Sequence, residues 1–380
     1  MSGRGPNEAL IGVPGSRRAL ATPSLVLDVE ALDHNIASLA AHARLNHYEV
    51  RPNAKVHKSI DIARRQVAAG AIGVACATLA EAEAMTLGGV PGVMLFAAVG
   101  SEKKLARLAE LNARADALVV VTDGNPTVEQ FAAVARRSGR PLHVLVDIYI
   151  GGHRTGLADA SRAVDLARAI SETPGLEYAG VHAYVGGLKK SGPFEDRRAI
   201  VHGLVVPLVE VVERLVAAGL PPRIVSGGGT ASHDIDHELG VFTENKSGSY
   251  ALMDVNYAAC VMRRDDAHPF LPALTVRTTV TNAAQLGFVV TDAGYKELDA
   301  VHGVAPAVIR GADPSATYSM VGDDMGRIDF EPPARPLDVG DAVEVLPPHC
   351  YLTLTMYSQY HVVRGEDLID IWPVYSRDNW

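Results

Sequence analysis

Residues 142–186 have the sequence LHVLVDIYIGGHRTGLADASRAVDLARAISETPGLEYAGVHAYVG. The two ends of this stretch, 142–150 and 178–186, are short apolar runs of the kind that form buried strands. In the middle, residues 161–172 have apolar side chains spaced three and four apart, which indicates an amphipathic helix. A strand, a helix and a second strand in this order are typical of a parallel sheet that is buried on both faces.

The same alternation of apolar runs and helical stretches extends from residue 22 to about residue 250. It contains about eight units in about 230 residues, which favours a (β/α)8 barrel of the TIM type. An open doubly wound sheet is the alternative fold. The other predicted strands lie at residues 24–28, 48–54, 72–77, 93–99, 117–123 and 223–229.

After about residue 255 the pattern changes to one typical of β structure. The segments 275–294, 340–349 and 351–375 are rich in Val, Thr and Tyr and are separated by turn residues. The sequence therefore predicts three parts. These are an N-terminal extension over 1–21 that packs on or near the β domain, a barrel over 22–254, and a mostly-β C-terminal domain over 255–380.

The composition of the chain excludes some classes of protein. The 380 residues carry a formal net charge of −9, and no basic cluster is long enough to neutralise many phosphates, so we expect no nucleic-acid partner. No apolar run approaches the length of about 18 residues that a membrane span needs. The three cysteines, Cys76, Cys260 and Cys350, are too few and too scattered for a disulfide framework, which favours a reducing cytoplasm.

The active site of such a barrel lies at the carboxyl ends of its strands, so polar residues at those ends are the candidates. Lys55 lies in the stretch RPNAKVHKS, residues 51–59, at the end of a predicted strand. A lysine held among other cations in a pocket has a lowered pKa and can form a Schiff base with an aldehyde. An ordinary strand-to-helix corner with solvated charges is the alternative. Strand alternation places Arg51 on the same face as Lys55, and Lys58 is interpreted as the solvated residue.

Two further strand ends carry candidate residues. The run SGGGT, residues 226–230, can orient several backbone N–H groups toward a phosphate, although a flexible turn would have the same composition. Arg154 follows another strand, and its guanidinium can donate a hydrogen bond to a ring nitrogen and keep that nitrogen unprotonated; a surface arginine is the simpler interpretation. A reactive lysine, a phosphate loop and a cation for a pyridine nitrogen together indicate a pyridoxal phosphate site. His182 and Asp254 are interpreted as structural residues.

The chain resembles the fold-type III pyridoxal phosphate enzymes of the D-threonine aldolase and D-serine dehydratase family, which includes 3-hydroxy-D-aspartate aldolases. The likeness runs from about Thr22 to the C-terminus and rests on motifs that occur in the order and spacing of the family. These motifs are TPSLVLDVEALDHNI, RPNAKVHKS, VDIYIGGHRTGL, YAGVHAYVGGL, VSGGGTASHD, GSYALMDVNYA, TDAGYKEL and PPHCYLTLTMY. The resemblance implies an alanine-racemase-like barrel, a C-terminal β domain, an amino-acid substrate and a homodimer with the active site at the subunit interface.

The resemblance also implies roles for individual residues. Lys55 matches the Schiff-base lysine, Arg154 the arginine near the pyridine nitrogen, and Tyr184 a tyrosine near the cofactor. Tyr257 matches a tyrosine that approaches the phosphate. The phosphate loop is matched by Ser226, Gly228, Gly229 and Thr230.

One motif departs from the family. The family holds a divalent metal with a histidine and with an aspartate or cysteine two residues later. His349 matches the histidine, but Tyr351 stands at the second position. If this stretch is a strand, the side chain of Cys350 points to the opposite face and cannot replace the missing ligand. A metal is therefore expected to be absent or weakly bound.

The preferred function is a lyase reaction in which a D-3-hydroxy amino acid such as D-threonine is cleaved to glycine and an aldehyde. Lys55 is the expected cofactor lysine, His349 the candidate base, and Tyr351 a residue that takes over part of the metal's role. One alternative is a metal-free racemase or epimerase that uses Lys55 with Tyr351 or His349. Others are a dehydratase for D-serine or another 3-hydroxy-D-amino acid, and a non-catalytic pyridoxal phosphate carrier.

Overall fold

The computed structural model of the chain describes residues 4–151, 154–186, 188, 192–265, 267–300, 303–330 and 337–377. The chain divides into two compact units. The β unit comprises Met1–Ile36, Ser249–Ala259 and His268–Arg377, and the α/β unit comprises Ala37–Gly248 and Cys260–Ala267. These boundaries differ from the predicted ones, because the segment up to residue 36 belongs with the C-terminal part of the chain.

The α/β unit contains a parallel sheet. Its strands are β2 (Glu49–Val50), β3 (Ala75–Cys76), β4 (Met94–Leu95), β5 (Val119–Thr122), β6 (Leu142–Ile148), β7 (Leu176–Ala183), β8 (Ile224–Gly227) and β9 (Glu244–Asn245). In the described residues they form one eight-stranded sheet in the order β2-β9-β8-β7-β6-β5-β4-β3. A parallel bridge between Asn53 and Ala75 links the two ends of this order. The closed ring of pairings is consistent with the predicted barrel.

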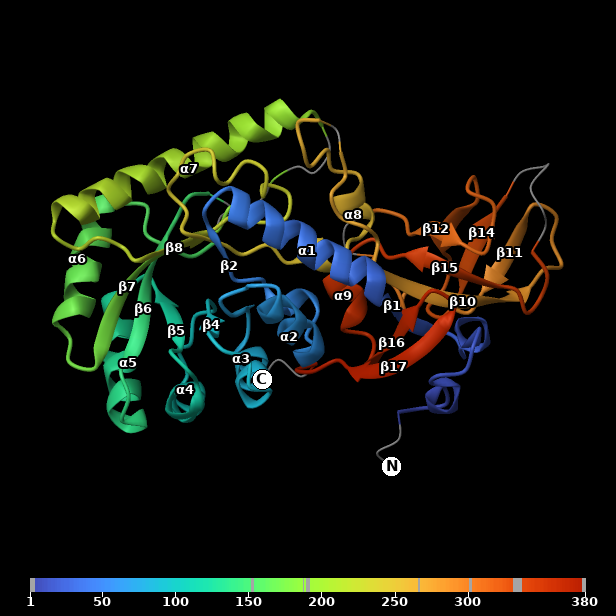
Figure 1. Cartoon of the computed structure of the whole chain (residues 1–380), viewed down its shortest axis with the longest axis horizontal. Helices are drawn as coiled ribbons and strands as arrows, with labels where there is room; N and C mark the ends of the chain where they lie inside the picture. The colour runs from blue at the N-terminus through green and yellow to red at the C-terminus, as the bar shows by residue number, and fades with distance from the viewer. Residues whose placement is uncertain are drawn as a thin grey trace. The chain divides into compact units, whose positions relative to one another are not determined.

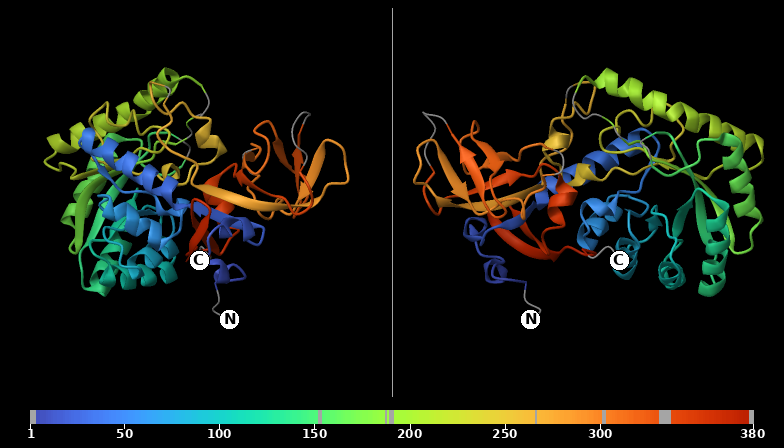
Figure 2. Two further views of the ribbon diagram at one scale, coloured as in Figure 1. Left: turned by 45° about the vertical axis from the view of Figure 1, so that its right-hand side comes forward. Right: turned by 180° about the vertical axis from the view of Figure 1, so that it is seen from behind.

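Helices lie outside these strands (Figures 1 and 2). They are α2 (Ile60–Ala68), α3 (Leu79–Leu87), α4 (Glu102–Arg114), α5 (Asn125–Ser138), α6 (Ala160–Glu172) and α7 (Phe194–Ala217). Several begin at a side chain that accepts a backbone N–H; Thr78 and Glu81 form a capping box at the start of α3. Successive side chains of β5 point to opposite faces of the sheet. Val119 and Val121 pack in a small cluster with residues of the neighbouring strands. Val120 packs in the larger hydrophobic core, which includes residues of the helices.

The predicted strand 24–28 does form, but the prediction that it belongs to the barrel is wrong. This strand, β1 (Ser24–Asp28), lies in the sheet of the β unit, antiparallel to β10 (Leu274–Asn282) and parallel to β16 (Gln359–Arg364). Four of its five residues are buried, a pattern that suits a central strand of either sheet, so the sequence pattern does not distinguish them. The remaining barrel position is taken by the two-residue strand β9, whose residues Glu244 and Asn245 are polar and give no apolar signal in the sequence.

The β unit contains a mostly antiparallel nine-stranded sheet in the described residues, in the order β11-β14-β13-β12-β15-β10-β1-β16-β17. Its further strands are β11 (Phe288–Thr291), β12 (Ala307–Arg310), β13 (Thr317–Met320), β14 (Gly326–Asp329), β15 (Ala342–Leu346) and β17 (Asp367–Pro373). The N-terminal segment lies against this sheet, where Arg17 forms a buried ion pair of 2.6 Å with Glu344 of β15. The unit also contains the short helices α8 (Val255–Ala258) and α9 (Cys350–Leu354), and α1 (Val29–Leu45) continues from this unit into the other.

No helix in the described part of the chain combines the length and the apolar character that crossing a membrane requires.

Candidate active site

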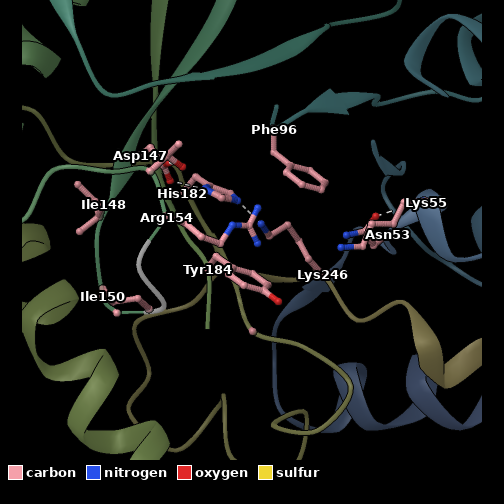
Figure 3. Close-up of a pocket in the computed structure, with 13 residues that line it drawn as sticks. Asn53, Lys55, Phe96, Asp147, Ile148, Ile150, Arg154, His182, Tyr184 and Lys246 are labelled. Atoms are coloured by element: carbon pink, nitrogen blue, oxygen red, sulfur yellow. Dashed lines mark hydrogen bonds and ion pairs between the residues drawn. The ribbon is translucent and has the colours of Figure 1, made fainter. Parts of the chain in front are cut away.

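The α/β unit has a pocket at the carboxyl ends of its strands (Figure 3). The side chains around it come from segments that are far apart in the sequence but adjacent in the ring of strands. The lining residues are Asn53, Lys55, Phe96, Asp147, Ile148, Ile150, Gly151, Arg154, Thr155, His182, Tyr184, Gly228 and Lys246. Three of the predicted site residues, Lys55, Arg154 and Tyr184, therefore share one pocket with Gly228 of the predicted phosphate loop.

Lys55 is positioned by a short 3-10 helix, Ala54–Val56, that begins a few residues after the end of β2. The side chain of Asn53 caps this helix by accepting a hydrogen bond of 3.2 Å from the Lys55 backbone N–H. Lys55 is half-buried and lines the pocket. Its place at a strand end agrees with the prediction, although the predicted strand over 48–54 is shorter than expected and ends at Val50.

Arg51 and Lys58, two other cations of the stretch RPNAKVHKS, form ion pairs with buried glutamates. Lys58 is only 4% exposed, and its Nζ lies 2.9 Å from Oε1 of the buried Glu81, so the interpretation of Lys58 as a solvated residue is wrong. Arg51 is buried and forms an ion pair of 3.0 Å with Glu244 of β9. Within this stretch, Lys55 is thus the cation that lines the pocket.

Lys246 is a second lysine of the pocket, and sequence reasoning missed it. It directly follows β9, is 6% exposed, and its Nζ contacts Nε2 of His182. The Nζ also lies 5.0 Å from the centre of the Phe96 ring. Burial lowers the pKa of Lys246 to about 7, an effect to which the nearby cations Lys55 and Arg154 also contribute. The lysine stands in the polar run TENKSG, where nothing in the local pattern distinguishes it from a surface lysine.

His182 links Lys246 to a carboxylate. The Nδ1 atom of His182 lies 2.6 Å from Oδ1 of Asp147, and the Thr155 hydroxyl donates a hydrogen bond of 2.6 Å to Oδ2 of the same carboxylate. Burial lowers the pKa of His182, and the positive charge of Lys246 lowers it further. His182 therefore lines the pocket as part of a hydrogen-bonded chain, which the interpretation of it as a structural residue did not anticipate.

Arg154 and Tyr184 lie on a more exposed part of the pocket. The guanidinium carbon of Arg154 is 4.5 Å from the centre of the Tyr184 ring, which is a cation–π contact. Both residues are exposed, whereas Lys246, His182 and Asp147 are buried. The buried cation of this pocket is thus Lys246, whereas Arg154 is exposed.

The predicted phosphate loop begins in the last two residues of β8 and is built around Asp236. Gly228 lines the pocket with a φ of +69°, and a Cβ at this position would overlap the Asp236 carboxyl, so the conformation requires glycine. Asp236 Oδ2 accepts hydrogen bonds from Gly229 N–H at 3.1 Å, from the Ser232 hydroxyl at 3.0 Å and from the Asn245 amide at 2.7 Å. Ser226 and Thr230 are buried in the same segment.

The donor set and the space in this pocket fit pyridoxal phosphate. Lys55 supplies an amine for the aldehyde, and the backbone at Gly229 faces open space, since a Cβ there would meet no atom within 4 Å. Buried polar side chains supply hydrogen-bonding partners for a polar ring.

The remaining predicted site residues, His349, Tyr351 and Tyr257, belong to the β unit. His349 is the N-cap of α9, and its ring centre is 4.0 Å from that of Tyr351 and 6.5 Å from that of Tyr257. The expectation that Cys350 points away from His349 assumed a strand and is wrong, because Cys350 begins a helix. In this helical turn, ligand atoms of Asp254, His349 and Cys350 all lie within 4.8 Å of one another, and all three residues are buried.

Asp254 holds this cluster together. Its Oδ1 accepts a hydrogen bond of 2.9 Å from the Tyr257 backbone N–H, its Oδ2 accepts one of 3.0 Å from Cys350 N–H, and Oδ2 lies 3.2 Å from Nδ1 of His349. A thiol, an imidazole and a carboxylate are the ligand types that zinc binds in proteins, and three of them leave a fourth position for water or substrate. The donor chemistry therefore fits a zinc-type divalent ion, although the ligand set differs from the one the resemblance implies.

Comparisons with known proteins agree with this architecture. Residues 27–248 match the family model "Alanine racemase, N-terminal domain", and residues 273–363 match the model "Putative serine dehydratase domain". The chain is 32% identical to a 3-hydroxy-D-aspartate aldolase of Paracoccus denitrificans (strain Pd 1222), over 94% of this chain and 92% of the relative. It is also 32% identical to a D-threonine aldolase of Arthrobacter sp, with the same two coverages.

A solved structure gives the same result. The crystal structure of D-threonine aldolase from Filomicrobium marinum matches with a TM-score of 0.88 and 31% sequence identity, over 95% of this chain and 96% of that chain. The match covers both units of the chain. The chain therefore belongs to the alanine-racemase-like family in which a putative serine dehydratase domain follows the racemase-type N-terminal domain, the family that includes D-threonine aldolase and 3-hydroxy-D-aspartate aldolase.

Proposed function

We propose that this protein is a pyridoxal phosphate-dependent lyase that cleaves D-3-hydroxy amino acids to glycine and an aldehyde. The observation that carries the proposal is the pocket in which Lys55, Lys246, Arg154 and Gly228 converge at the strand ends of the α/β unit. Family membership supports the reaction type, because the relatives at 32% identity are named aldolases for D-threonine and 3-hydroxy-D-aspartate. The barrel assignment, (β/α)8 of the TIM type, is part of the same proposal.

In this proposal the residues of the pocket have separate tasks. Pyridoxal phosphate, when bound, withdraws electrons from the substrate Cα and so stabilises the negative charge left by Cα–Cβ cleavage. The Lys55 amine is the group that bonds the aldehyde carbon, and the backbone around Gly228 and Gly229, with Ser226 and Thr230, holds the phosphate. Arg154 and Tyr184 lie on the exposed part of the pocket, where they can bind the carboxylate of an incoming amino acid.

The base that removes the proton of the substrate hydroxyl is proposed to be His349, with Tyr351 beside it. Asp254 lies 3.2 Å from Nδ1 of His349 and can fix the orientation of the imidazole ring. Tyr257 is proposed to approach the phosphate, as the family resemblance implies. An H349Q variant should retain cofactor binding and lose most of the cleavage rate, because Gln cannot accept and release a proton near neutral pH.

We further propose that Asp254, His349 and Cys350 bind a divalent metal of the zinc type. A metal held there would act as a Lewis acid toward an oxygen ligand, and His349 would then be a ligand, so its proposed role as the base applies to the protein without a metal. The proposal replaces the expectation of an absent or weak metal, and it rests on the three donor types that lie within 4.8 Å. The protein is also proposed to be cytoplasmic and to form a homodimer. Light scattering of the purified protein tests the proposed dimer.

The test of the proposed reaction is a product assay. The protein is loaded with pyridoxal phosphate and incubated with D-threonine, 3-hydroxy-D-aspartate and their L-isomers, with and without added zinc or manganese. Aldehyde and glycine from a D-isomer, and not from its L-isomer, are the expected products. A keto acid with ammonia would instead assign a dehydratase, and solvent deuterium at Cα without bond cleavage would assign a racemase. A protein that binds the cofactor and shows no spectral change with any of these amino acids would be a carrier.

A further inference from the structure

Strand β9 lies between the two strands that lead into the proposed cofactor site. Its residue Asn245 is paired with Gly227 of β8 on one side and with Val50 of β2 on the other. Strand β8 leads into the phosphate loop, and β2 leads toward the turn that carries Lys55. Asn245, which is buried, is therefore adjacent to both parts of the site.

Toward the phosphate loop, Asn245 is bonded to Asp236. Its Nδ2 donates a hydrogen bond of 2.7 Å to Oδ2 of Asp236, and the Gly229 N–H donates one of 3.1 Å to the same oxygen. Gly228 packs directly on this pair, because a Cβ there would overlap the side chains of both residues. The position of the loop backbone therefore depends on Asp236 and Asn245. A phosphate held by this backbone would compete with Asp236 for the Gly229 N–H.

Toward Lys55, Asn245 is bonded to Ser247. Oδ1 of Asn245 accepts hydrogen bonds from the Ser247 hydroxyl at 2.6 Å and from the Ser247 N–H at 2.8 Å. The Ser247 carbonyl accepts one of 3.1 Å from the Asn53 N–H, and the Asn53 side chain caps the turn of Lys55 (Figure 3). Hydrogen bonds thus run without a break from the phosphate loop to the turn of Lys55. We call the residues that carry them, Asp236, Asn245, Ser247 and Asn53, the Asn245 network.

Burial makes the centre of this network specific. Asp236, Asn245 and Ser247 are 4%, 1% and 0% exposed, so water does not compete for their hydrogen bonds. The asparagine amide offers a donor to the carboxyl group of Asp236 and an acceptor to Ser247 at the same time. Alanine at position 245 would offer neither, and would leave the two ends of the network without a link through side chains.

We infer that Asp236 and Asn245 are positioning residues that couple the phosphate loop to the turn of Lys55, so that a phosphate bound at the loop also fixes the turn. This inference rests on the proposed function, because it takes residues 226–230 as the phosphate loop and Lys55 as the residue that bonds the aldehyde. Fixing one end of the network leaves less motion to be lost at the other end, so the coupling is positive. The phosphate and the aldehyde of the cofactor therefore assist the binding of each other.

Hydrogen exchange with inorganic phosphate as the probe tests this coupling without any reaction. The full chain, freed of cofactor, is compared with and without phosphate, and exchange is followed in the peptides that contain residues 226–232 and 53–58. In the wild type, both peptides are expected to exchange at least about 5-fold more slowly with phosphate, which is the lower end of ordinary coupling between sites. In N245A, only the peptide 226–232 is expected to be slowed.

Two further variants serve as controls. N112A removes another buried asparagine, whose side chain donates a hydrogen bond of 3.1 Å to the Arg140 carbonyl near the amino end of β6, away from the pocket. N112A is therefore expected to behave as the wild type, and it controls for a general loss of stability. S247A removes the hydroxyl bond to Asn245 and keeps the bond from the backbone N–H, so its response is expected to lie between those of the wild type and N245A.

Attachment of an aldehyde to Lys55 gives an independent measurement. 5′-Deoxypyridoxal carries the aldehyde of the cofactor but no phosphate, and borohydride trapping at several concentrations measures its affinity for Lys55. Inorganic phosphate is expected to raise this affinity at least about 5-fold more in the wild type than in N245A. A direct effect of the phosphate charge on the amine is common to both proteins, so the difference between them measures the coupling through Asn245.

The outcomes separate the inference from the proposed function. The inference is overturned if phosphate slows exchange in the peptide 226–232 but not in 53–58 of the wild type, if N245A responds as the wild type does, or if N112A loses the response as well. Should N245A not fold, a full wild-type response of S247A overturns it. If phosphate leaves 226–232 unchanged, the proposed phosphate loop fails and the inference fails with it. The proposed function fails separately if borohydride leaves no pyridoxal phosphate on Lys55.

Discussion

Lys55 and Lys246 line one pocket from the carboxyl ends of two paired strands. Strands β2 and β9 run parallel, with Glu49 opposite Glu244 and Val50 opposite Asn245, so the segments that leave them carry both lysines into the same space. The two amines interact electrostatically, since Lys55 contributes to the lowered pKa of Lys246. The positive charge of Lys55 therefore favours the neutral form of the Lys246 amine.

The first prediction is that only one of these amines bonds the cofactor. After the holoenzyme is reduced with borohydride and digested, mass spectrometry should find the label on the peptide that contains Lys55. Lys55 is half-buried and lies on a short 3-10 helix, whereas the Lys246 amine is engaged with His182. A K55A variant should lose the covalent label, and a K246R variant should keep it on Lys55. A label on Lys246 in the wild type would reverse the assignment of the two lysines.

The second prediction concerns the glycines of the phosphate loop. G228A should lower the free energy of unfolding by about 2–4 kcal/mol, because Gly228 has a φ of +69° and a Cβ would overlap Asp236. G229A is the matched control, since a Cβ at Gly229 would meet no atom within 4 Å and should cost less than about 1 kcal/mol. Urea denaturation of both apoproteins measures the difference. Equal losses of stability would show that the loop does not have this conformation.

Several residues at the strand ends that line the pocket could be predicted from the sequence, because the strands before them are strong apolar runs. The runs before Asp147 and before Tyr184 gave strands β6 and β7, and the residues after them line the pocket as expected. Lys246 was missed because the strand before it, β9, consists of Glu244 and Asn245, which are polar and give no apolar run. The position of β1 was missed for a different reason: its apolar pattern suits either sheet, and only pairing with strands about 250 residues later decides between them.

The third prediction follows from the carboxyl group of Asp236. Burial raises its pKa to about 7, in spite of the hydrogen bonds from Ser232, Gly229 and Asn245. The unfolded chain releases this proton near pH 4, so the folded state binds more protons between about pH 4 and pH 7. The wild type should therefore lose stability as the pH rises through this range.

A D236N variant separates this effect from the titration of other groups. Its stability relative to the wild type should increase by about 2–4 kcal/mol between pH 4 and pH 8, because the amide cannot ionise. Denaturation curves of the two apoproteins at several pH values provide the measurement. A constant difference across the range would mean that Asp236 is ionised in the fold at all these pH values. Its Oδ1 has no hydrogen-bond partner among the described residues, which suits a neutral carboxyl group.

The last prediction concerns the ligands of the proposed metal. Cobalt(II) substitutes for zinc, and a thiolate bound to it gives a charge-transfer absorption band that imidazole and carboxylate ligands do not give. If Cys350 is a ligand together with Asp254 and His349, the cobalt-loaded protein should show this band, and C350S should lose it while retaining weaker metal binding. Tyr351 offers no ligand to such a site, so Y351F should leave the band unchanged.

The same experiment distinguishes this ligand set from the one expected of the family motif, in which the second ligand stands two residues after the histidine. A Y351D variant restores an oxygen ligand at that position beside His349. If the motif position is the metal site, Y351D should bind the metal more tightly than the wild type and should show no thiolate band. If Cys350 is the ligand, as the helical turn of α9 indicates, the band should persist in Y351D, because the thiol, the imidazole and the Asp254 carboxylate already lie within 4.8 Å. Metal content after dialysis, measured by elemental analysis, is the second readout, and a wild type that holds no cobalt under these conditions would contradict the proposed site.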